Sequence, residues 1–299
     1  MNLLITGSSG YLGRNFLETV KNDDNLYFFL VRSKKKILKF KKIKNIEFIE
    51  CDLKKYDEVK KKLKNYQIDI IINFAWVGAT NKFKNSNLQK QNLLLLKNLV
   101  KISKVLKIKK FVGFGSQAEY GLKKKKINEL MICRPITKYG HIKLKSYKLL
   151  NSYFKKNKIK FVWIRLFSSF GPHDDDNFLI PYLIKNFLKN KKIYLTKCEQ
   201  KWDFIYSKDV IKATKFLAHS NMANGIYNLG SGETQNLKSI VLKIKKLTKS
   251  GSKIDFGALK YSKNQIMYLH ADINKIREIN WKYSPHFDQA IRETIKYYK

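Results

Sequence analysis

The fold is decided by the stretch Leu3-Leu4-Ile5-Thr6-Gly7-Ser8-Ser9-Gly10-Tyr11-Leu12-Gly13. A short apolar run ends in a turn with three glycines, and residues 10–20 then show the spacing of an amphipathic helix. A glycine-rich turn between a strand and a helix is the setting that a dinucleotide-binding loop needs. Gly7 would permit the tight turn, Gly10 a close approach to a pyrophosphate, and Gly13 close packing of helix on strand. The spacing is GxxGxxG rather than GxGxxG, so a purely structural turn is the alternative interpretation.

Strand-like and helix-like segments alternate outward from this loop. Strands are expected at residues 2–5, 26–31, 46–50, 68–74, 110–114 and 160–166, and helices at 10–20, 56–63, 88–106 and 139–154. This alternation predicts an α/β fold, a Rossmann-type doubly wound parallel sheet. After residue 166 the alternation becomes less regular. Helices are expected at 178–187, 209–218, 237–248 and 288–298, and extended segments at 202–205 and 226–229. We predict an NAD(P)-binding domain at 1–165 and a smaller substrate lobe at 166–299, some segments of which return to the first domain.

The composition excludes several classes of protein. With 44% hydrophobic and 13% aromatic residues among 299, the chain can bury a core, so disorder is not its main state. No apolar run approaches the roughly 20 residues that a membrane-spanning helix needs. The three cysteines, Cys51, Cys133 and Cys198, are far apart, which argues against a disulfide framework or a zinc cluster. We predict a reduced, cytoplasmic protein with no metal site.

The formal net charge is +39, because 62 Lys and Arg outnumber 23 Asp and Glu. Such a charge would suit a nucleic-acid partner. The lysines, however, are scattered along the whole chain rather than gathered in one tail. This scatter favours a positive field that draws in anionic small molecules such as nucleotides over a specific nucleic-acid site.

The ends of the second and third predicted strands bear on the choice of cofactor. An acidic residue at the second strand end would bind a ribose 2′-hydroxyl, but Arg32 and Ser33 stand there. Both suit a 2′-phosphate, so NADP is favoured, with NAD as the alternative. Asp52, with Leu53, follows the third strand and would lie near the adenine; a helix N-cap is the other reading of Asp52. The predicted cofactor site also includes Ser9, Tyr11 and Leu12.

Three further residues predict hydride-transfer chemistry. Tyr139 and Lys143 are four residues apart at the start of a predicted helix and so share one face. An ammonium near a phenol favours the phenolate, so we expect Lys143 to lower the pKa of Tyr139. Such a Tyr can exchange a proton with a carbonyl or alcohol oxygen. Ser116, at the end of the fifth predicted strand, could hydrogen-bond the same oxygen.

A series of motifs continues through the second half. It consists of Ile164–Phe167 with Gly171-Pro172, then Trp202–Ile205 with Asp209-Val210, then Tyr227–Glu233. With the glycine loop and the Ser–Tyr–Lys set, this series resembles the extended short-chain dehydrogenase/reductase family, which includes nucleotide-sugar epimerases, dehydratases and reductases. The resemblance covers essentially the whole chain. It implies Ser116, Tyr139 and Lys143 as the catalytic group, with Lys143 also holding the nicotinamide ribose. It places Asn73, Phe74 and Ala75 beside the cofactor.

Departures from the family pattern narrow the expected reaction. Sugar 4,6-dehydratases carry an acid–base pair directly after the catalytic Ser or Thr, whereas Gln117 and Ala118 stand here. Ala118 also replaces the cysteine of the epimerase-reductase that makes GDP-fucose. Many 4-epimerases hold the sugar diphosphate with an Asn where Ser168 stands, and Trp202 stands where Arg is common. We assign Gln117, Ser168 and Trp202 to the substrate site, with core packing as the alternative for Trp202.

Because these departures argue against dehydration and epimerisation, the expected reaction is simple hydride transfer to a sugar carbonyl. Residues 254–273 are similar to CDP-abequose synthase-like 4-keto-6-deoxyhexose reductases. The resemblance therefore implies reduction of a nucleoside-diphosphate 4-keto-6-deoxyhexose for surface polysaccharide. Two alternatives stay open, a 4-epimerase that retains NAD and a non-catalytic nucleotide- or RNA-binding member. The family also implies a homodimer built on the helices at 88–106 and 139–154; the alternative is that these helices only cover the sheet.

Overall fold

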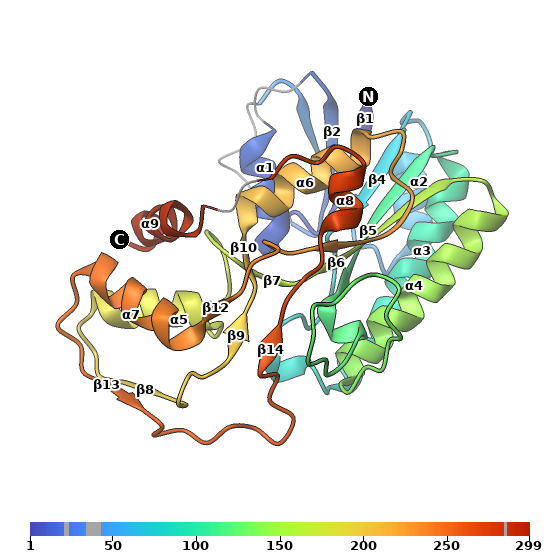
Figure 1. Cartoon of the computed structure of the whole chain (residues 1–299). Helices are drawn as coiled ribbons and strands as arrows, with labels where there is room; N and C mark the ends of the chain where they lie inside the picture. Colours follow the sequence, from blue (N-terminus) through green and yellow to red (C-terminus); the bar gives the residue numbers. More distant parts are fainter. Residues whose placement is uncertain (21–23, 34–42, 284–285) are drawn as a thin grey trace.

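The computed structural model describes residues 1–20, 24–33, 43–283 and 286–299, and its centre is a seven-stranded sheet (Figure 1). Neighbouring strands are parallel throughout, in the order β11-β6-β5-β4-β1-β2-β3. The order turns back on itself between β1 and β4, as in a doubly wound sheet, so the predicted fold class is confirmed. The strands are β1 (Asn2–Thr6), β2 (Leu26–Val31), β3 (Ile46–Glu50), β4 (Ile70–Asn73), β5 (Lys110–Ser116), β6 (Lys160–Leu166) and β11 (Gly225–Leu229).

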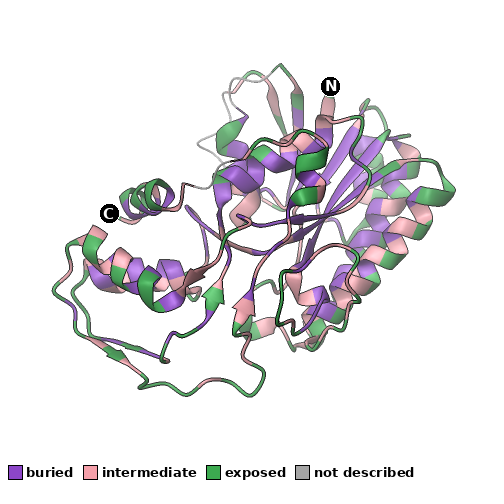
Figure 2. Ribbon diagram, in the orientation of Figure 1, coloured by how far each residue is buried: buried purple, intermediate pink, exposed green. Residues whose placement is uncertain are grey.

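Helices cover both faces of this sheet, and Figure 2 shows the strands buried between them. Because strand side chains alternate, Leu3 and Ile5 of β1 belong to one buried cluster and Leu4 to the other. Phe16 and Val210 join the first cluster, and helices α2 to α4 supply the second. The covering helices are α1 (Tyr11–Thr19) and α6 (Ser207–His219) on one face, and α2 (Tyr56–Leu63), α3 (Gln91–Val105) and α4 (Lys138–Lys156) on the other.

A third buried cluster lies in the second half of the chain, to the left of the central sheet in Figure 1. Three helices pack together there, α5 (Leu179–Leu188), α7 (Leu237–Thr248) and α9 (Phe287–Tyr298). Short strands flank them. These pair as β7 (Ser168–Phe170) with β10 (Phe204–Tyr206), β8 (Ile193–Leu195) with β13 (Ile254–Phe256), and β9 (Lys201–Trp202) with both β12 (Gln235–Asn236) and β14 (Tyr268–Leu269). Helix α8 (Asn274–Glu278) follows β14.

A buried carboxylate divides the extended segment expected at 202–205. Asp203 is fully buried between β9 and β10, and its oxygens accept hydrogen bonds from the main-chain N–H groups of Ser231, Gly232 and Ala271. These three donors lie in two later segments of the chain. Asp203 therefore fastens those segments to the strand pair next to Trp202.

Strand β11 returns from the second half of the chain to the edge of the central sheet. Its residue Asn228 is fully buried and accepts a hydrogen bond from the Tyr120 hydroxyl at 2.7 Å. The Asn228 amide also donates to the Ile127 carbonyl, and its main-chain N–H donates to Glu129. The last strand of the sheet thus fixes the loop that follows Ser116.

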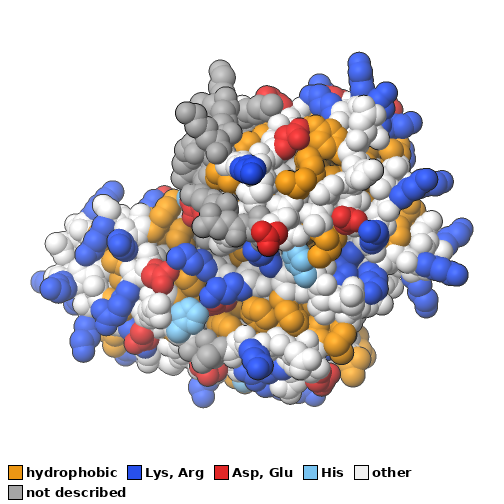
Figure 3. Space-filling model, turned by 90° about the horizontal axis from the view of Figure 1, so that it is seen from above, with side chains coloured by type: hydrophobic (Ala, Val, Ile, Leu, Met, Phe, Trp, Pro, Cys, Tyr) orange, Lys and Arg blue, Asp and Glu red, His pale blue; other side chains and the backbone are white. Residues whose placement is uncertain are grey.

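The charge on one face of the molecule is dispersed. Lys and Arg side chains project from all parts of the face shown in Figure 3, with acidic groups between them. Among the described residues, the helices are too short or too polar to cross a bilayer. Within the same residues, His, Cys, Asp and Glu form no group of three or more that could hold a metal ion.

Candidate functional site

A cavity of about 580 Å³ lies at the carboxyl edge of the central sheet and extends into the second half of the chain. The glycine loop forms one end, the end of β5 and the start of α4 form the middle, and β8 and β9 lie at the far end. It gathers most of the predicted site residues, namely Gly7, Gly10, Tyr11, Leu12, Gly13, Phe74, Ser116, Gln117, Tyr139, Lys143, Ser168 and Trp202. The predicted residues outside its lining are Ser9, Arg32, Ser33, Asp52, Leu53, Asn73 and Ala75.

Two positions in the glycine loop admit no side chain. Gly7 has a φ of +75°, and a Cβ atom there would lie 2.5 Å from the main-chain nitrogen of Ala75. A Cβ on Gly13 would lie 2.3 Å from the Gly7 carbonyl oxygen. Gly10 precedes α1 and provides no side-chain cap, so the first N–H groups of the helix are open to the cavity. An uncapped helix N-terminus of this kind fits the pyrophosphate of a dinucleotide.

The residues outside the lining follow neighbouring strands. Arg32 is exposed directly after β2. Asp52 accepts a hydrogen bond from the Lys54 main chain at 3.0 Å, and the N-cap position of α2 is Lys55, so the N-cap reading of Asp52 is wrong. Leu53 is buried. Ala75 donates its N–H to Asn73, which also accepts from Thr6, so Asn73 links the ends of β1 and β4.

Ser116 and Tyr139 come together in the middle of the cavity. Ser116 ends β5, and its hydroxyl accepts the Ala118 N–H at 3.2 Å. Tyr139 lies in the first turn of α4, where Thr137 caps the helix by accepting the Gly140 N–H at 3.1 Å. Both residues line the cavity, and Ser116 acts to lower the pKa of Tyr139. The two groups can therefore act on one oxygen atom.

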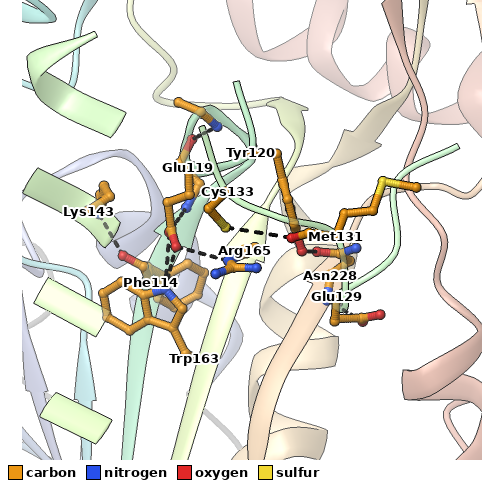
Figure 4. A network of polar contacts seen from close by, with 12 residues as sticks. Phe114, Glu119, Tyr120, Glu129, Met131, Cys133, Lys143, Trp163, Arg165 and Asn228 are labelled. Carbon is orange, nitrogen blue, oxygen red and sulfur yellow. Dashed lines mark hydrogen bonds and ion pairs between the residues drawn. The ribbon is translucent and has the colours of Figure 1, made fainter. Parts of the chain in front are cut away.

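A buried ion pair holds the turn after Ser116 in place (Figure 4). Glu119 is fully buried, and one of its carboxylate oxygens accepts the Ser116 N–H at 2.9 Å and the Trp163 indole N–H at 3.1 Å. The other oxygen accepts the Arg165 guanidinium at 2.9 Å. Our sequence analysis missed Glu119, although its place three residues after Ser116 is the pattern of a capping box. Arg165, a cation inside a buried strand, was the second available signal.

Burial controls the protonation of Tyr139 and Lys143. It raises the pKa of Tyr139 to about 12, and the nearby Glu119 carboxylate adds to this while the Ser116 hydrogen bond opposes it. Burial lowers the pKa of Lys143 to about 7, with Glu119 opposing. The expected net lowering of the pKa of Tyr139 is therefore wrong, because burial raises this pKa instead. The Lys143 ammonium donates to the Phe114 carbonyl at 2.6 Å, and its nitrogen lies 5.6 Å from the centroid of the Tyr139 ring. Tyr139 keeps its proton at neutral pH.

Sequence analysis also missed Trp76 and Lys84, which line the cavity. The Lys143 nitrogen lies 3.5 Å from the centroid of a Trp76 ring. Burial lowers the pKa of Lys84, which makes its charge responsive to a bound anion. Both residues follow β4 in a segment without a recognisable motif, so no pattern of residues pointed to them. Of the described residues that line the cavity, Lys84 and Lys143 are the cations and Asp174 is the acid.

The predicted substrate residues lie toward the far end. The Trp202 indole N–H donates to the Ser168 hydroxyl at 2.5 Å, so these two residues form one wall. Gln117 and Gln200 each bury a side-chain oxygen that has no hydrogen-bond partner among the described residues. Unsatisfied amide oxygens in a cavity are acceptors that a ligand can fill.

The chain is similar to several known proteins over nearly its full length. It is 25% identical to CDP-abequose synthase from Salmonella muenchen, covering 98% of this chain and 96% of that one. It is 24% identical to ADP-L-glycero-D-manno-heptose-6-epimerase from Brachyspira hyodysenteriae, covering 92% and 90%. Among solved structures, UDP-glucuronic acid 4-epimerase from Bacillus cereus, in complex with UDP-glucuronic acid and NAD, has a TM-score of 0.89 at 20% identity. This match covers 100% of our chain and 99% of the other.

A family model settles the assignment. The model of the NAD dependent epimerase/dehydratase family matches residues 3–230, which include the glycine loop and the Ser116, Tyr139 and Lys143 set. This is more than two thirds of the chain, and it confirms the family resemblance drawn from the motifs. The protein belongs to the NAD-dependent epimerase/dehydratase family of enzymes.

Proposed function

We propose that this protein is a nucleotide-sugar ketoreductase that reduces the keto group of a nucleoside-diphosphate 4-keto-6-deoxyhexose. One observation carries the proposal: Tyr139 and Ser116 line the same cavity as the glycine loop. A reductase needs a proton donor for the new alcohol and nothing more from the protein at that carbon. Gln117 and Ala118, next to Ser116, offer no group to remove a proton beside the carbonyl.

The catalytic residues would divide the work at the substrate oxygen. A bound reduced nicotinamide would supply the hydride. Ser116 would hydrogen-bond the carbonyl oxygen and stabilise its growing negative charge. Tyr139 would give that oxygen its proton, and the nearby Lys143 ammonium would stabilise the phenolate left behind. Solvent would then return the proton to Tyr139, whose raised pKa favours the phenol at neutral pH.

The glycine loop and the substrate wall would bind the two ligands. Gly7, Gly10 and Gly13, with Ser9, Tyr11 and Leu12, would hold the dinucleotide at the N-terminus of α1. Asp52, Leu53, Phe74 and Ala75 would surround its adenosine half. Gln117, Ser168 and Trp202 would contact the sugar nucleotide. Lys84, a cation in the cavity lining, would attract the diphosphate.

Between NADP and NAD, we propose NADP as the cofactor. Arg32 is exposed directly after β2, where it would meet a ribose 2′-phosphate, and its sequence neighbours Val31 and Ser33 are not acidic. The family is NAD-dependent, and similar structures contain NAD. Comparing kcat/KM with NADPH and NADH in the wild type and in Arg32→Ala tests this choice.

The reductase activity is tested by mixing the purified protein with freshly made nucleoside-diphosphate 4-keto-6-deoxyhexoses and following the absorbance of NADPH and NADH. Stoichiometric consumption with one sugar supports the proposal. No consumption, together with nicotinamide that stays bound during purification, would instead indicate a 4-epimerase. That second candidate is favoured by the epimerases among the similar proteins, which match over 92% and 100% of the chain, against 98% for the synthase.

The two parts of the chain would have different binding roles. We propose that residues 1–165 bind the cofactor and that residues 166–299 mainly bind the substrate, with β11 and α6 returning to the first unit. A cytoplasmic location fits the use of a nicotinamide cofactor. We also propose a homodimer built on the outer faces of α3 and α4, which lie side by side.

A further inference from the structure

We propose that Trp76 is a positioning residue that keeps the Lys143 side chain charged and aimed at the catalytic end of the cavity. This inference rests on the proposed function, which gives Lys143 its catalytic role. It assigns Trp76 a task that follows from its contacts in this chain.

Lys143 is a buried cation that forms no ion pair among the described residues. Only 4% of its surface is exposed. Its ammonium donates one hydrogen bond, to the Phe114 carbonyl, and its nitrogen lies 3.5 Å from the centroid of the Trp76 ring. The carbonyl dipole and the indole face are therefore the close contacts that offset the loss of water around this charge.

Trp76 is fixed in this position by a buried side chain. Its indole N–H donates to the Gln89 side-chain oxygen at 3.0 Å, and Gln89 is fully buried. The Gln89 amide donates in turn to the carbonyls of Gly78 and Phe83, at 2.6 and 3.0 Å. The indole is thus held at its edge by the segment that follows β4. The ring has no freedom to turn away from Lys143 without breaking a buried hydrogen bond.

The Trp76 ring also contacts Tyr139. The two rings meet edge to face, with centroids 5.9 Å apart. Trp76 therefore touches both members of the pair that carries out the proton transfer. A smaller side chain at this position would remove a contact from Lys143 and from Tyr139 together.

A cation–π contact stabilises the charged amine over the neutral one, and the effect grows when water is excluded. Removing the indole should therefore lower the pKa of Lys143 further, by about one pH unit. The titratable and charged groups around Lys143 are Tyr139 on α4, Glu119 in the turn after β5, Arg165 on β6 and Lys84 in the segment after β4. A substitution at Trp76 leaves the chemical identity of these four groups unchanged, although Tyr139 loses its ring contact.

The direct test is NMR of the protein labelled with ¹³C at the lysine ε-carbons, with Lys143→Met to assign the Lys143 signal. Lys110 is the internal reference, because burial lowers its pKa to about 8 while its ammonium donates to the carbonyls of Leu217 and Ser220, away from the cavity. In Trp76→Leu we expect the pKa of Lys143 to fall by about one pH unit and that of Lys110 to stay unchanged. Trp76→Phe keeps an aromatic face and should give less than half this shift, and it preserves the test if leucine unfolds the protein.

The matched control is Trp281→Leu, because Trp281 packs against Phe216 outside the cavity lining. It should leave both lysine pKa values and the activity as they are. If the pKa of Lys143 is the same in the wild type and in Trp76→Leu, the inference is wrong. If it falls but Lys143→Met retains full turnover, the indole contact is as described and the proposed function of Lys143 fails. In an active enzyme, the alkaline fall of kcat/KM should move to lower pH in Trp76→Leu by the same interval as the pKa.

Discussion

Arg165 and Glu119 form an ion pair in which the guanidinium and the carboxylate are 2.9 Å apart and the side chains are 3% and 0% exposed. The same carboxylate accepts the N–H of Ser116, so the pair connects β6 to the turn that follows Ser116. Removing one partner leaves an uncompensated buried charge, which costs about 3–5 kcal/mol. We expect Glu119→Gln and Arg165→Met each to lower the free energy of unfolding by that amount, as measured with urea. The double variant should lose less than the sum, and strict additivity would show that the pair is not coupled.

Tyr139→Phe tests the proton donor. We expect turnover to fall by at least about 100-fold, because the carbonyl oxygen loses its acid, while the dinucleotide binds as before. Turnover is followed by nicotinamide absorbance and binding by fluorescence titration. Tyr153→Phe on the same helix is the control, since Tyr153 packs with Phe154 away from the cavity. Normal turnover in Tyr139→Phe would refute the mechanism.

Lys143 makes the folded state less stable at neutral pH. Its pKa is about 7 when folded, against 10.5 for the free side chain, so the unfolded chain binds more protons between these values. Stability from this group therefore rises as the pH increases from about 7 to 10.5, and the full penalty is present below pH 7. Lys143→Met should raise the free energy of unfolding at about pH 6, by at most about 5 kcal/mol, and abolish most turnover. Lower stability of this variant at pH 6 would contradict the assignment.

Glycine substitutions separate packing from binding in the nucleotide loop. Gly13→Ala places a methyl group 2.3 Å from the Gly7 carbonyl oxygen, so we expect a loss of stability of about 1–3 kcal/mol or more. At Gly10 the nearest atom would be 3.3 Å away, and alanine should be tolerated by the fold. Gly10→Ala should instead weaken dinucleotide binding. Thermal unfolding and calorimetric titration of both variants distinguish the two effects.

The affinity between the two copies of the proposed dimer should increase with salt concentration. Neither α3 nor α4 contains an acidic residue, and their exposed positions include Lys97, Lys101, Lys145 and Lys148. A two-fold axis would bring these lysines near their copies. Salt screens such repulsion, so the dimer should be tighter at about 0.5 M than at about 0.05 M salt. Sedimentation equilibrium measures this, and dissociation at the higher salt concentration would argue against this face.

The sequence predicted the segments whose apolar residues repeat at helix or strand spacing and the segments that carry a recognisable motif. The strands and helices of the central sheet were found to within a few residues because each is long enough to show its apolar spacing. The strands of two or three residues around β9 have no such spacing, and their pairing is set by distant partners such as Asp203. The cavity gathered the residues expected from motifs. Trp76 and Glu119 act through tertiary contacts, so their tasks became visible only with the fold.

The protonation states of Tyr139 and Lys143 could not be predicted from the sequence. Spacing alone placed Lys143 near Tyr139 and predicted a lowered phenol pKa. The opposite direction follows from burial, which neither residue type nor spacing reveals. Sequence motifs therefore predicted that the two side chains lie near each other, but they did not predict the burial that sets the pKa values.

The return of β11 to the sheet has a consequence for synthesis on the ribosome. The proposed catalytic residues up to Lys143 are made early, but this edge of β6 has no neighbour until residues 225–229 emerge. Until then, Tyr120 lacks its hydrogen-bond partner Asn228, and the loop after Ser116 is not fastened. A nascent chain that stops before β11 presents an open strand edge, which other chains can pair with. The enzyme therefore matures only when about three quarters of its chain has been made, and truncation before β11 should yield aggregates rather than a cofactor-binding fragment.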